Sequence, residues 1–450
     1  MMEALAQLLG PKGMIREAAA MQPFLHEWRD AYVGRARAIL LPETTAQVSE
    51  ILKLAQAHKA KIVTQGGNTG LTGAQIPFEA GDEYVLSLKR MQQIRRMDAG
   101  ADAMIAEAGV TLAHAQQAAA EAGRLFPLSL ASEGSATIGG TISTNAGGTA
   151  VITYGNMREL VLGLEVVLAS GEVWNGLKRL RKDNSGYDLK QIFIGAEGTL
   201  GIITAASLRL FPAPKGRAVG LAALSSPAQA VDLYAAARQA AGLCLTALEL
   251  IPRFGIELMM KHAGKRDPLP SPAAWYALIE LSGGDSDAHY AERLASLIPA
   301  DGVIAQSLTQ AEDLWALREG LSQAQKQEGP SIKHDVSVPV SSLAAFVGET
   351  LAALAQAFPQ ARPLPFGHAG DGNLHFNVSV PEGFTPKREV SDLVHSLTLK
   401  HEGSIAAEHG VGRLKRELLA ATKSPVEMEM MRGLKHMLDP ANILNPGKVV

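Results

Sequence analysis

The stretch that decides the fold is GSATIGGTISTNAGG, residues 134–148, in which five glycines stand among serines, threonines and an asparagine. Because glycine disfavours both helix and strand, the run is expected to form neither a stable helix nor a central strand. We expect the run to become ordered only by packing against another group. The stretch therefore indicates a loop that contacts a ligand.

Two more glycine-rich runs lie in the same half of the chain. QGGNTGLTG, residues 65–73, follows a predicted strand, and GAEGTLGI, residues 195–202, stands at the end of another. Glycine allows positive φ and a close approach of backbone N–H groups, and successive amides form anion-binding nests. Three such runs in one domain indicate an extended ligand with several polar sections. A dinucleotide fits that description and a small metabolite does not.

Residues 65–73 match neither common nucleotide-binding motif. Their glycine spacing differs from the Rossmann fingerprint, and AQIPF with Pro77 follows where a phosphate-capping helix would begin. The run is not a Walker motif either, because it does not end in GK[ST]. A plain surface turn is the alternative for this run taken alone.

The pattern around these runs predicts a first domain that contains both strands and helices. Strands are expected at residues 61–65, 84–88, 160–170, 192–195 and 202–211. Thr44 and Gln47 have the spacing of a capping box, and apolar residues follow at helical intervals. Two prolines within residues 210–216 mark a domain boundary.

The rest of the chain predicts a second domain of the α+β class. A strand is expected at residues 274–283, and amphipathic helices at residues 225–242 and 287–298. Ser424, Pro425 and Glu427 predict the start of a further helix, which Asp439-Pro440 ends. The expected divisions are a dinucleotide-binding domain at 1–213, a second domain at 214–423, and a helix and tail at 424–450 that return to the first domain.

Composition excludes several classes of protein. Of 450 residues, 42 are basic and 45 acidic, so no positive surface argues for nucleic acid. No run of about 18 uninterrupted apolar residues is present, and Glu3 stands where a secretory signal carries positive charge. Cys244 is the only cysteine, which excludes an internal disulfide and fits a reducing compartment. We expect a soluble protein in the cytoplasm, with peripheral membrane contact left open.

The second domain carries a histidine-rich segment, FGHAGDGNLHFNVSV, residues 366–380. Its second half alternates as a strand does, so His375 and Asn377 face one side, and a flexible turn lets His368 fold back toward them. Glu408 and His409 follow about thirty residues later. Two imidazoles and a carboxylate are a common ligand set for a catalytic divalent metal, with zinc favoured and manganese or ferrous iron as alternatives. The spacing matches no stock metal motif, so hydrogen-bonded structural histidines remain an alternative.

Residues 65–73, 126–148 and 182–204 together resemble the FAD-binding domain of the vanillyl-alcohol oxidase superfamily, in its branch of D-lactate and D-2-hydroxyglutarate dehydrogenases. The resemblance implies an α+β, two-domain flavoprotein of the PCMH type. Its FAD domain would consist of two α/β subdomains, and its substrate domain would be α+β with an antiparallel sheet. None of the three runs contains histidine or cysteine, so non-covalent FAD is expected.

The resemblance also implies which residues contact FAD. The first run would cradle the pyrophosphate, the second would line the flavin and ribityl portion, the third would reach the adenosine side, and the tail would return near the ring. The residues concerned are Gln65, Gly66, Gly67, Asn68, Thr69, Gly70, Gly73, Gly134, Ser135, Thr137, Ile138, Gly139, Gly140, Asn145, Gly147, Glu197, Gly201, Ile202 and Asn445. One departure is Ser129, where the family often has aspartate.

By the same resemblance, the second half of the chain supplies the chemistry. The metal ligands would be His368, His375 and Glu408, the catalytic base His409, and the substrate contacts Arg318, Ser322, Lys333, Asn377 and His409. An arginine fork binds a carboxylate through two parallel hydrogen bonds, which orients the carbon that bears the hydroxyl group.

The expected activity is oxidation of a small D-2-hydroxy acid, with D-2-hydroxyglutarate favoured, by hydride transfer to FAD. D-lactate or glycolate dehydrogenation on the same scaffold is the nearest alternative. A metal-dependent hydrolase that binds a nucleotide, and a silent flavin-binding electron carrier, are the alternatives from other classes. The electron acceptor is expected to be a quinone or an electron-transfer flavoprotein, and a homodimer is left open.

Overall fold

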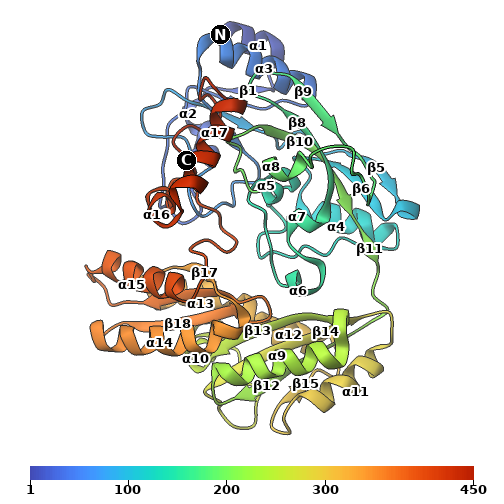
Figure 1. Ribbon diagram of the computed structural model, residues 1–450, viewed down its shortest axis with the longest axis vertical. Coiled ribbons are helices and arrows are strands. Elements are labelled where there is room, and N and C mark those ends of the chain that lie inside the picture. Colours follow the sequence, from blue (N-terminus) through green and yellow to red (C-terminus); the bar gives the residue numbers. More distant parts are fainter. The chain divides into compact units, whose positions relative to one another are not determined.

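The computed structural model describes residues 1–450, which form two compact units (Figure 1). Unit 1 consists of Met1–Gly148, Gly155–Ala213 and Glu408–Val450, and unit 2 of Thr149–Tyr154 and Pro214–Ala407. The chain thus passes into unit 2 within the proline-containing stretch named above. It returns to unit 1 at Glu408, whereas the sequence analysis placed the return at residue 424.

Unit 1 contains a four-stranded sheet in the order β1-β2-β4-β3. Its strands are β1 (Met14–Ile15), β2 (Ile39–Leu40), β3 (Ile62–Gln65) and β4 (Tyr84–Ser87), with β4 parallel to both β2 and β3. Helix α3 (Thr45–His58) packs Val48, Ile51 and Leu52 into the core beside this sheet, together with α1 (Met2–Leu9). The predicted N-cap is confirmed, since the Thr44 hydroxyl accepts from Gln47 N at 3.2 Å. The Gln47 side chain accepts from Glu43 N rather than from Thr44 N.

A five-stranded antiparallel sheet completes the scaffold of unit 1, in the order β5-β6-β10-β8-β9. Its strands are β5 (Ile94–Asp98), β6 (Ala103–Glu107), β8 (Val161–Val167), β9 (Val173–Gly176) and β10 (Ile202–Arg209). The remaining elements of unit 1 are α2 (Ala18–Leu25), α4 (Leu112–Glu121), β7 (Arg124–Leu125), α5 (Ile138–Ser143), α7 (Met157–Leu160), α8 (Lys190–Phe193), β11 (Phe211–Pro212), α16 (Arg416–Thr422) and α17 (Pro425–Leu438).

Two local expectations were wrong in this unit. Residues 138–143 form the short helix α5, although the glycine-rich run was expected to form no helix. Tertiary bonds supply the order, because Gly139 N donates to Ala108 O at 2.8 Å and a Cβ at Gly139 would lie 2.7 Å from Ala108 Cβ. Residues 190–193 form helix α8 where a strand at 192–195 was expected, since a short apolar run does not distinguish the two structures.

Unit 2 is built on an antiparallel sheet in the order β15-β12-β14-β13-β18-β19-β16, with β17 also paired to β19. Its strands are β12 (Gly216–Leu224), β13 (Leu245–Pro252), β14 (Trp275–Gly283), β15 (Val303–Ile304), β16 (Ser331–Ile332), β17 (Asp335–Ser337), β18 (Arg362–His368) and β19 (Asn373–Ser379). Its helices are α6 (Val151–Tyr154), α9 (Pro227–Ala241), α10 (Arg253–Ala263), α11 (Asp287–Leu297), α12 (Leu308–Glu319), α13 (Leu321–Glu328), α14 (Leu343–Ala357) and α15 (Lys387–Lys400). The expected antiparallel sheet and α+β class are confirmed.

The two faces of this sheet are covered by different helices. Helices α9, α11, α14 and α15 share one apolar core with the sheet, and α9 and α14 lie side by side on it (Figure 1). Helices α10, α12 and α13 contribute to the other core, which contains Ile251, Leu364 and Phe366. Glu249, two residues before Ile251, belongs to the same side of β13 as this second core.

One helical stretch of unit 2, Val340–Ala357, is long and apolar enough to cross a membrane by length and composition alone. Leu343, Phe346, Val347 and Leu354 of this stretch are buried in the core that α14 shares with the sheet. The stretch therefore packs one apolar face into the core of unit 2.

Candidate active site

In unit 1, the first two glycine-rich runs pack backbone against backbone. A Cβ added to Gly67 would lie 1.8 Å from Ser135 O, and one added to Gly66 would lie 2.4 Å from Thr137 Oγ1. Asn68 takes a left-handed backbone conformation with φ 57, and its side chain donates to Pro23 O and His26 O. Only glycine fits at positions 66 and 67, so these two residues determine the conformation of the loop.

The backbone N–H groups of residues 66–70 donate to no acceptor within the protein. Amide donors that converge in a glycine-rich turn after a strand suit the phosphates of a dinucleotide. The residues present are therefore of a kind that fits the pyrophosphate of FAD. Gln65 stabilises the loop, because its amide nitrogen donates to Phe24 O and Gln75 O.

The third run and the tail join the same region of unit 1. Gly195 N donates to Ile142 O and Glu197 N to Ser143 O, which ties residues 195–197 to α5. The Asn445 amide donates to Glu197 O at 2.7 Å. Ile138 and Ile202 are fully buried. The three runs and Asn445, which the sequence proposed as one cofactor site, are thus brought together.

The carboxylate of Glu197 holds the segment that contains Glu408 and His409. It accepts from Val411 N at 2.7 Å and from Gly412 N at 2.9 Å, and burial raises its pKa to about 7. The Glu408 carboxylate accepts from Gly148 N at 2.7 Å, and Thr72 Oγ1 donates to the backbone oxygen of His409. Glu408 and His409 are therefore fixed within unit 1 against the first two glycine-rich runs.

In unit 2, strand pairing places four polar residues beside one another, two of which the sequence analysis had proposed for the site. Glu249 on β13 lies opposite His368 on β18, and His375 on β19 lies opposite both Phe366 on β18 and Asp335 on β17. Residues that are directly opposite in an antiparallel sheet point to the same face. The polar side chains therefore extend the side of the sheet that α12 and α13 cover.

Glu249 connects two residues that the sequence had proposed for different roles. It is fully buried, and its Oε1 lies 2.6 Å from His368 Nδ1 while its Oε2 accepts from Arg318 Nε at 2.6 Å. Burial alone would raise its pKa, but the charges of His368 and Arg318 and their hydrogen bonds hold the pKa of the Glu249 carboxyl at about 2. Glu249 is therefore an anion that orients one imidazole and one guanidinium.

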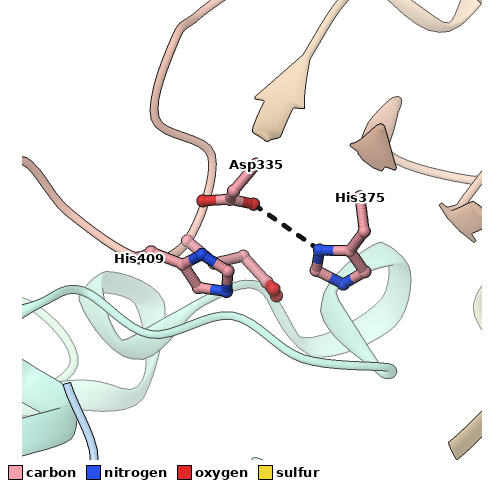
Figure 2. A group of neighbouring side chains, drawn as sticks. Asp335, His375 and His409 are labelled. Atoms are coloured by element: carbon pink, nitrogen blue, oxygen red, sulfur yellow. Dashed lines mark ion pairs between the residues drawn. The ribbon is translucent and has the colours of Figure 1, made fainter. Parts of the chain in front are cut away.

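His375 and Asp335 are the other potential metal ligands on this face. Their closest nitrogen and oxygen are 3.9 Å apart (Figure 2). The ring of His375 lies 5.8 Å from that of His368. Imidazole nitrogen and carboxylate oxygen are donors that divalent metals accept. Asp335 is buried and was not among the residues that the sequence proposed.

Lys333 and Asn377 are joined through Gln325 on α13. The amide oxygen of Gln325 accepts from Lys333 Nζ at 3.0 Å and from Asn377 Nδ2 at 2.9 Å, and its nitrogen donates to Ser379 Oγ. Since Lys333 can only donate, the amide of Gln325 has a single orientation, and Asn377 is left with its oxygen as an acceptor. Ser322, the remaining predicted substrate contact, lies exposed on α13.

Sequence reasoning missed Glu249, Gln325 and Asp335. Glu249 is the only charged residue of LTALELIP, and a lone charge in a buried apolar strand signals a paired site. Gln325 stands seven residues after Arg318, about two helical turns, although Gly320 separates the two helices. Neither signal names a partner: the partners of Glu249 lie 69 and 119 residues away, and Asn377 lies 52 residues from Gln325.

Two family models together match most of the chain. Residues 36–176 match the FAD binding domain, and residues 213–449 match the C-terminal domain of FAD linked oxidases. The D-2-hydroxyglutarate dehydrogenase of Xanthomonas citri pv. viticola is 39% identical over 96% of this chain and 93% of its own length. A probable mitochondrial D-2-hydroxyglutarate dehydrogenase of Oryza sativa subsp. japonica is 39% identical over 98% of this chain and 80% of its own length. The mitochondrial enzyme of Arabidopsis thaliana is 37% identical over 99% and 80%.

The expected cytoplasmic location is wrong, because the rice and Arabidopsis relatives are named mitochondrial. The single cysteine, Cys244, was one reason to expect the cytoplasm. A shortage of disulfides separates oxidising compartments from reducing ones and does not tell the reducing compartments apart.

Solved structures confirm the fold. The structure of p-cresol methylhydroxylase with substrate bound matches 99% of this chain and 95% of its own, with a TM-score of 0.75 and 19% identity. Alkyldihydroxyacetonephosphate synthase matches 99% of this chain with the same TM-score and 16% identity. With two matched FAD-oxidase domains and close relatives along nearly its whole length, the chain belongs to the FAD-dependent D-2-hydroxy acid dehydrogenases of the vanillyl-alcohol oxidase type, in the branch of the D-2-hydroxyglutarate and D-lactate dehydrogenases.

Proposed function

We propose that this dehydrogenase oxidises D-2-hydroxyglutarate to the 2-oxo acid, with a divalent metal held by His368, His375 and Glu408. The observation that carries the proposal is the polar face of the unit 2 sheet, where Arg318 and His368 share the carboxylate of Glu249. This face offers a fixed guanidinium, a fixed imidazole and further polar groups on neighbouring strands. Such a set suits a small acid with a hydroxyl group.

The substrate is proposed to be a dicarboxylate because two cations belong to the site. Arg318 is bonded to Glu249 through Nε, which leaves Nη1 and Nη2 as a two-pronged donor for a carboxylate. Lys333 is held by the neutral amide of Gln325, and its ammonium is a second point of attachment. The relatives named D-2-hydroxyglutarate dehydrogenase support the same choice.

The donor set suits a divalent metal, with zinc proposed and manganese or ferrous iron as alternatives. His368 presents Nδ1 to Glu249, so Nε2 is the nitrogen that would bind a metal. Ala407 N donates to Asp335 O, and Glu408 is the next residue, so chain continuity supports a role for Glu408 beside the histidine strands. When bound, such a metal polarises the oxygen that it contacts.

The protein's own groups would then perform the remaining tasks. Arg318 and Lys333 bind the carboxylates, and Asn377 offers its amide oxygen to the substrate. His409 accepts the hydroxyl proton, a task for which imidazole is suited near neutral pH. The glycine-rich runs would hold FAD without a covalent link, and bound FAD would supply the acceptor for the hydride. A quinone or an electron-transfer flavoprotein is proposed as the final acceptor.

Anaerobic bleaching of the flavin tests the proposed substrate directly. The purified protein is mixed with the D- and L-isomers of 2-hydroxyglutarate, malate and lactate, and with glycolate, and its visible spectrum is followed. D-2-hydroxyglutarate should bleach the flavin fastest, with at least a tenfold higher kcat/KM than D-lactate, because a second carboxylate meets Lys333. Faster bleaching by D-lactate or glycolate would reject the dicarboxylate assignment.

A further inference from the structure

Glu249 is a buried carboxylate in a strand that is otherwise apolar. It is the one charged residue of β13, its side chain is completely inaccessible, and each of its oxygens has a separate partner. A carboxylate in such a position is costly unless it is paired and hydrogen-bonded. An apolar side chain at this position would avoid the desolvation cost of a buried charge, so the presence of a carboxylate here indicates a role other than packing.

The two partners of Glu249 arrive from different elements. Antiparallel pairing of β13 with β18 places His368 directly across from it, and α12 supplies Arg318 from above the sheet. The guanidinium of Arg318 also lies over the Phe366 ring, with its carbon 4.9 Å from the ring centroid. The bond through Nε and the contact with the ring together leave one orientation for the two terminal nitrogens.

The same carboxylate fixes the state of His368. When the ring of His368 gives up its second proton to bind a metal, a hydrogen bond from Nδ1 to the carboxylate selects the tautomer whose Nε2 carries the lone pair, and it increases the ability of that nitrogen to donate to the metal. Removal of such an outer partner weakens metal binding even though no ligand is lost.

We propose that Glu249 is a positioning residue that orients a metal-binding imidazole and a carboxylate-binding guanidinium at once. The inference rests on the proposed function, since it assigns Glu249 to the site of His368 and Arg318. It assigns a role to a residue that the sequence analysis did not propose. It also couples two properties, because one substitution should weaken both metal affinity and substrate binding.

A neighbouring carboxylate provides a matched control. Glu280 on β14 accepts from Arg217 Nε at 2.8 Å and from Trp315 Nε1 at 2.8 Å, so it too bonds an arginine and a residue of α12. None of its partners belongs to the proposed site. Glu280→Gln therefore removes a structural carboxylate of the same sheet and leaves the site intact.

The experiment compares the wild type, Glu249→Gln and Glu280→Gln as FAD-loaded holoenzymes. Zinc affinity is measured by competition with a chelator, substrate binding by KM and kcat for D-2-hydroxyglutarate, and folding by thermal unfolding and bound FAD. Glu249→Gln should bind zinc about 10- to 100-fold more weakly. Its KM should rise at least tenfold, and its FAD content should be unchanged. Glu280→Gln should lose thermal stability with zinc affinity and KM within twofold of the wild type.

A second variant covers the case in which Glu249→Gln does not fold. Glu249→Asp keeps the charge but is one methylene shorter, so it reaches only one of the two partners. It should therefore either bind zinc more weakly or show a higher KM, and the effects on the two quantities should differ in size. If Glu249→Gln folds and keeps both its zinc affinity and its KM within twofold of the wild type, the role of Glu249 is overturned and the proposed function is unaffected. A wild type that binds no zinc would overturn the metal part of the proposed function together with it.

Discussion

Lys448 is a buried cation of unit 1 whose ammonium group has no hydrogen-bond partner in the protein. The residue is 1% exposed, and its Nζ lies 4.5 Å from the centre of the Phe78 ring. Burial lowers its pKa from 10.5 to about 8, although the nearby charge of Glu83 opposes the change. Between pH 8 and 10.5 the unfolded chain binds more protons at this position than the folded one, so the contribution of Lys448 to stability rises with pH in that window.

Lys448→Met should therefore stabilise the protein most at pH 7. The gap between 10.5 and about 8 corresponds to roughly 3 kcal/mol, and relaxation around the ammonium lowers the expected gain to about 1–3 kcal/mol. The advantage should shrink above pH 8 and vanish near pH 10.5. Denaturant unfolding of both proteins without FAD at several pH values measures it. The exposed Lys12→Met is the control and should show no such trend.

His409→Ala should separate the chemical step from cofactor binding. The backbone oxygen of His409 accepts from Thr72, and this contact survives truncation of the side chain, so FAD should stay bound. Loss of a general base should slow flavin reduction by about 10²- to 10⁴-fold. Anaerobic stopped-flow measurement gives the rate, and His436→Ala, an exposed histidine of α17, is the control. Unchanged reduction kinetics in His409→Ala would remove His409 from the role of base.

Gln325→Leu should raise KM more than it lowers kcat. Gln325 is fully buried, and its amide oxygen is the acceptor that Lys333 and Asn377 share. Without it, both side chains lose a fixed position, and a loss of about 1.4 kcal/mol corresponds to a tenfold higher KM. Gln323→Leu on the exposed side of α13 is the control. Equal KM values in the two variants would mean that Gln325 serves the fold alone.

At the scale of elements, local signals were sufficient for some helices and insufficient for others. Ser424, Pro425 and Glu427 predicted the start of α17, where the full capping box is present, because all of its partners lie within one turn. Helix α5 escaped prediction because its order comes from bonds to residues 108 and 110, nearly thirty positions earlier. Propensity describes a segment by itself, and tertiary contacts overrule it.

The loop at residues 65–73 offers a prediction at this scale. Gly67→Ala should lower FAD retention at least tenfold, because the new Cβ would lie 1.8 Å from Ser135 O and would push the two glycine-rich runs apart. The ratio of flavin to protein absorbance after gel filtration measures retention. Gly433→Ala is the matched control, since nothing lies within 4 Å of its Cβ in the exposed part of α17. There alanine should stabilise the helix by about 1 kcal/mol.

At the scale of the molecule, the sequence predicted which residue types perform the chemistry but not what holds them. His375 and Asn377 were placed on one face of a strand by their spacing alone, and β19 confirms this strand. Glu249 and Asp335 lie on strands that are distant in sequence, and only the order β13-β18-β19 with β17 brings them beside the histidines. Strand order follows from the whole core, so no local pattern could supply it.

Removal of the metal is the prediction that concerns the whole enzyme. None of the proposed metal ligands is among the proposed FAD contacts, which all belong to unit 1. Chelation should therefore abolish turnover with D-2-hydroxyglutarate and leave the flavin bound. Zinc or manganese should restore the rate, and the restored protein should melt at a higher temperature because the metal binds only the folded state. Metal content is checked by elemental analysis. Full turnover by a protein verified as metal-free would show that His368, His375 and Glu408 serve another purpose.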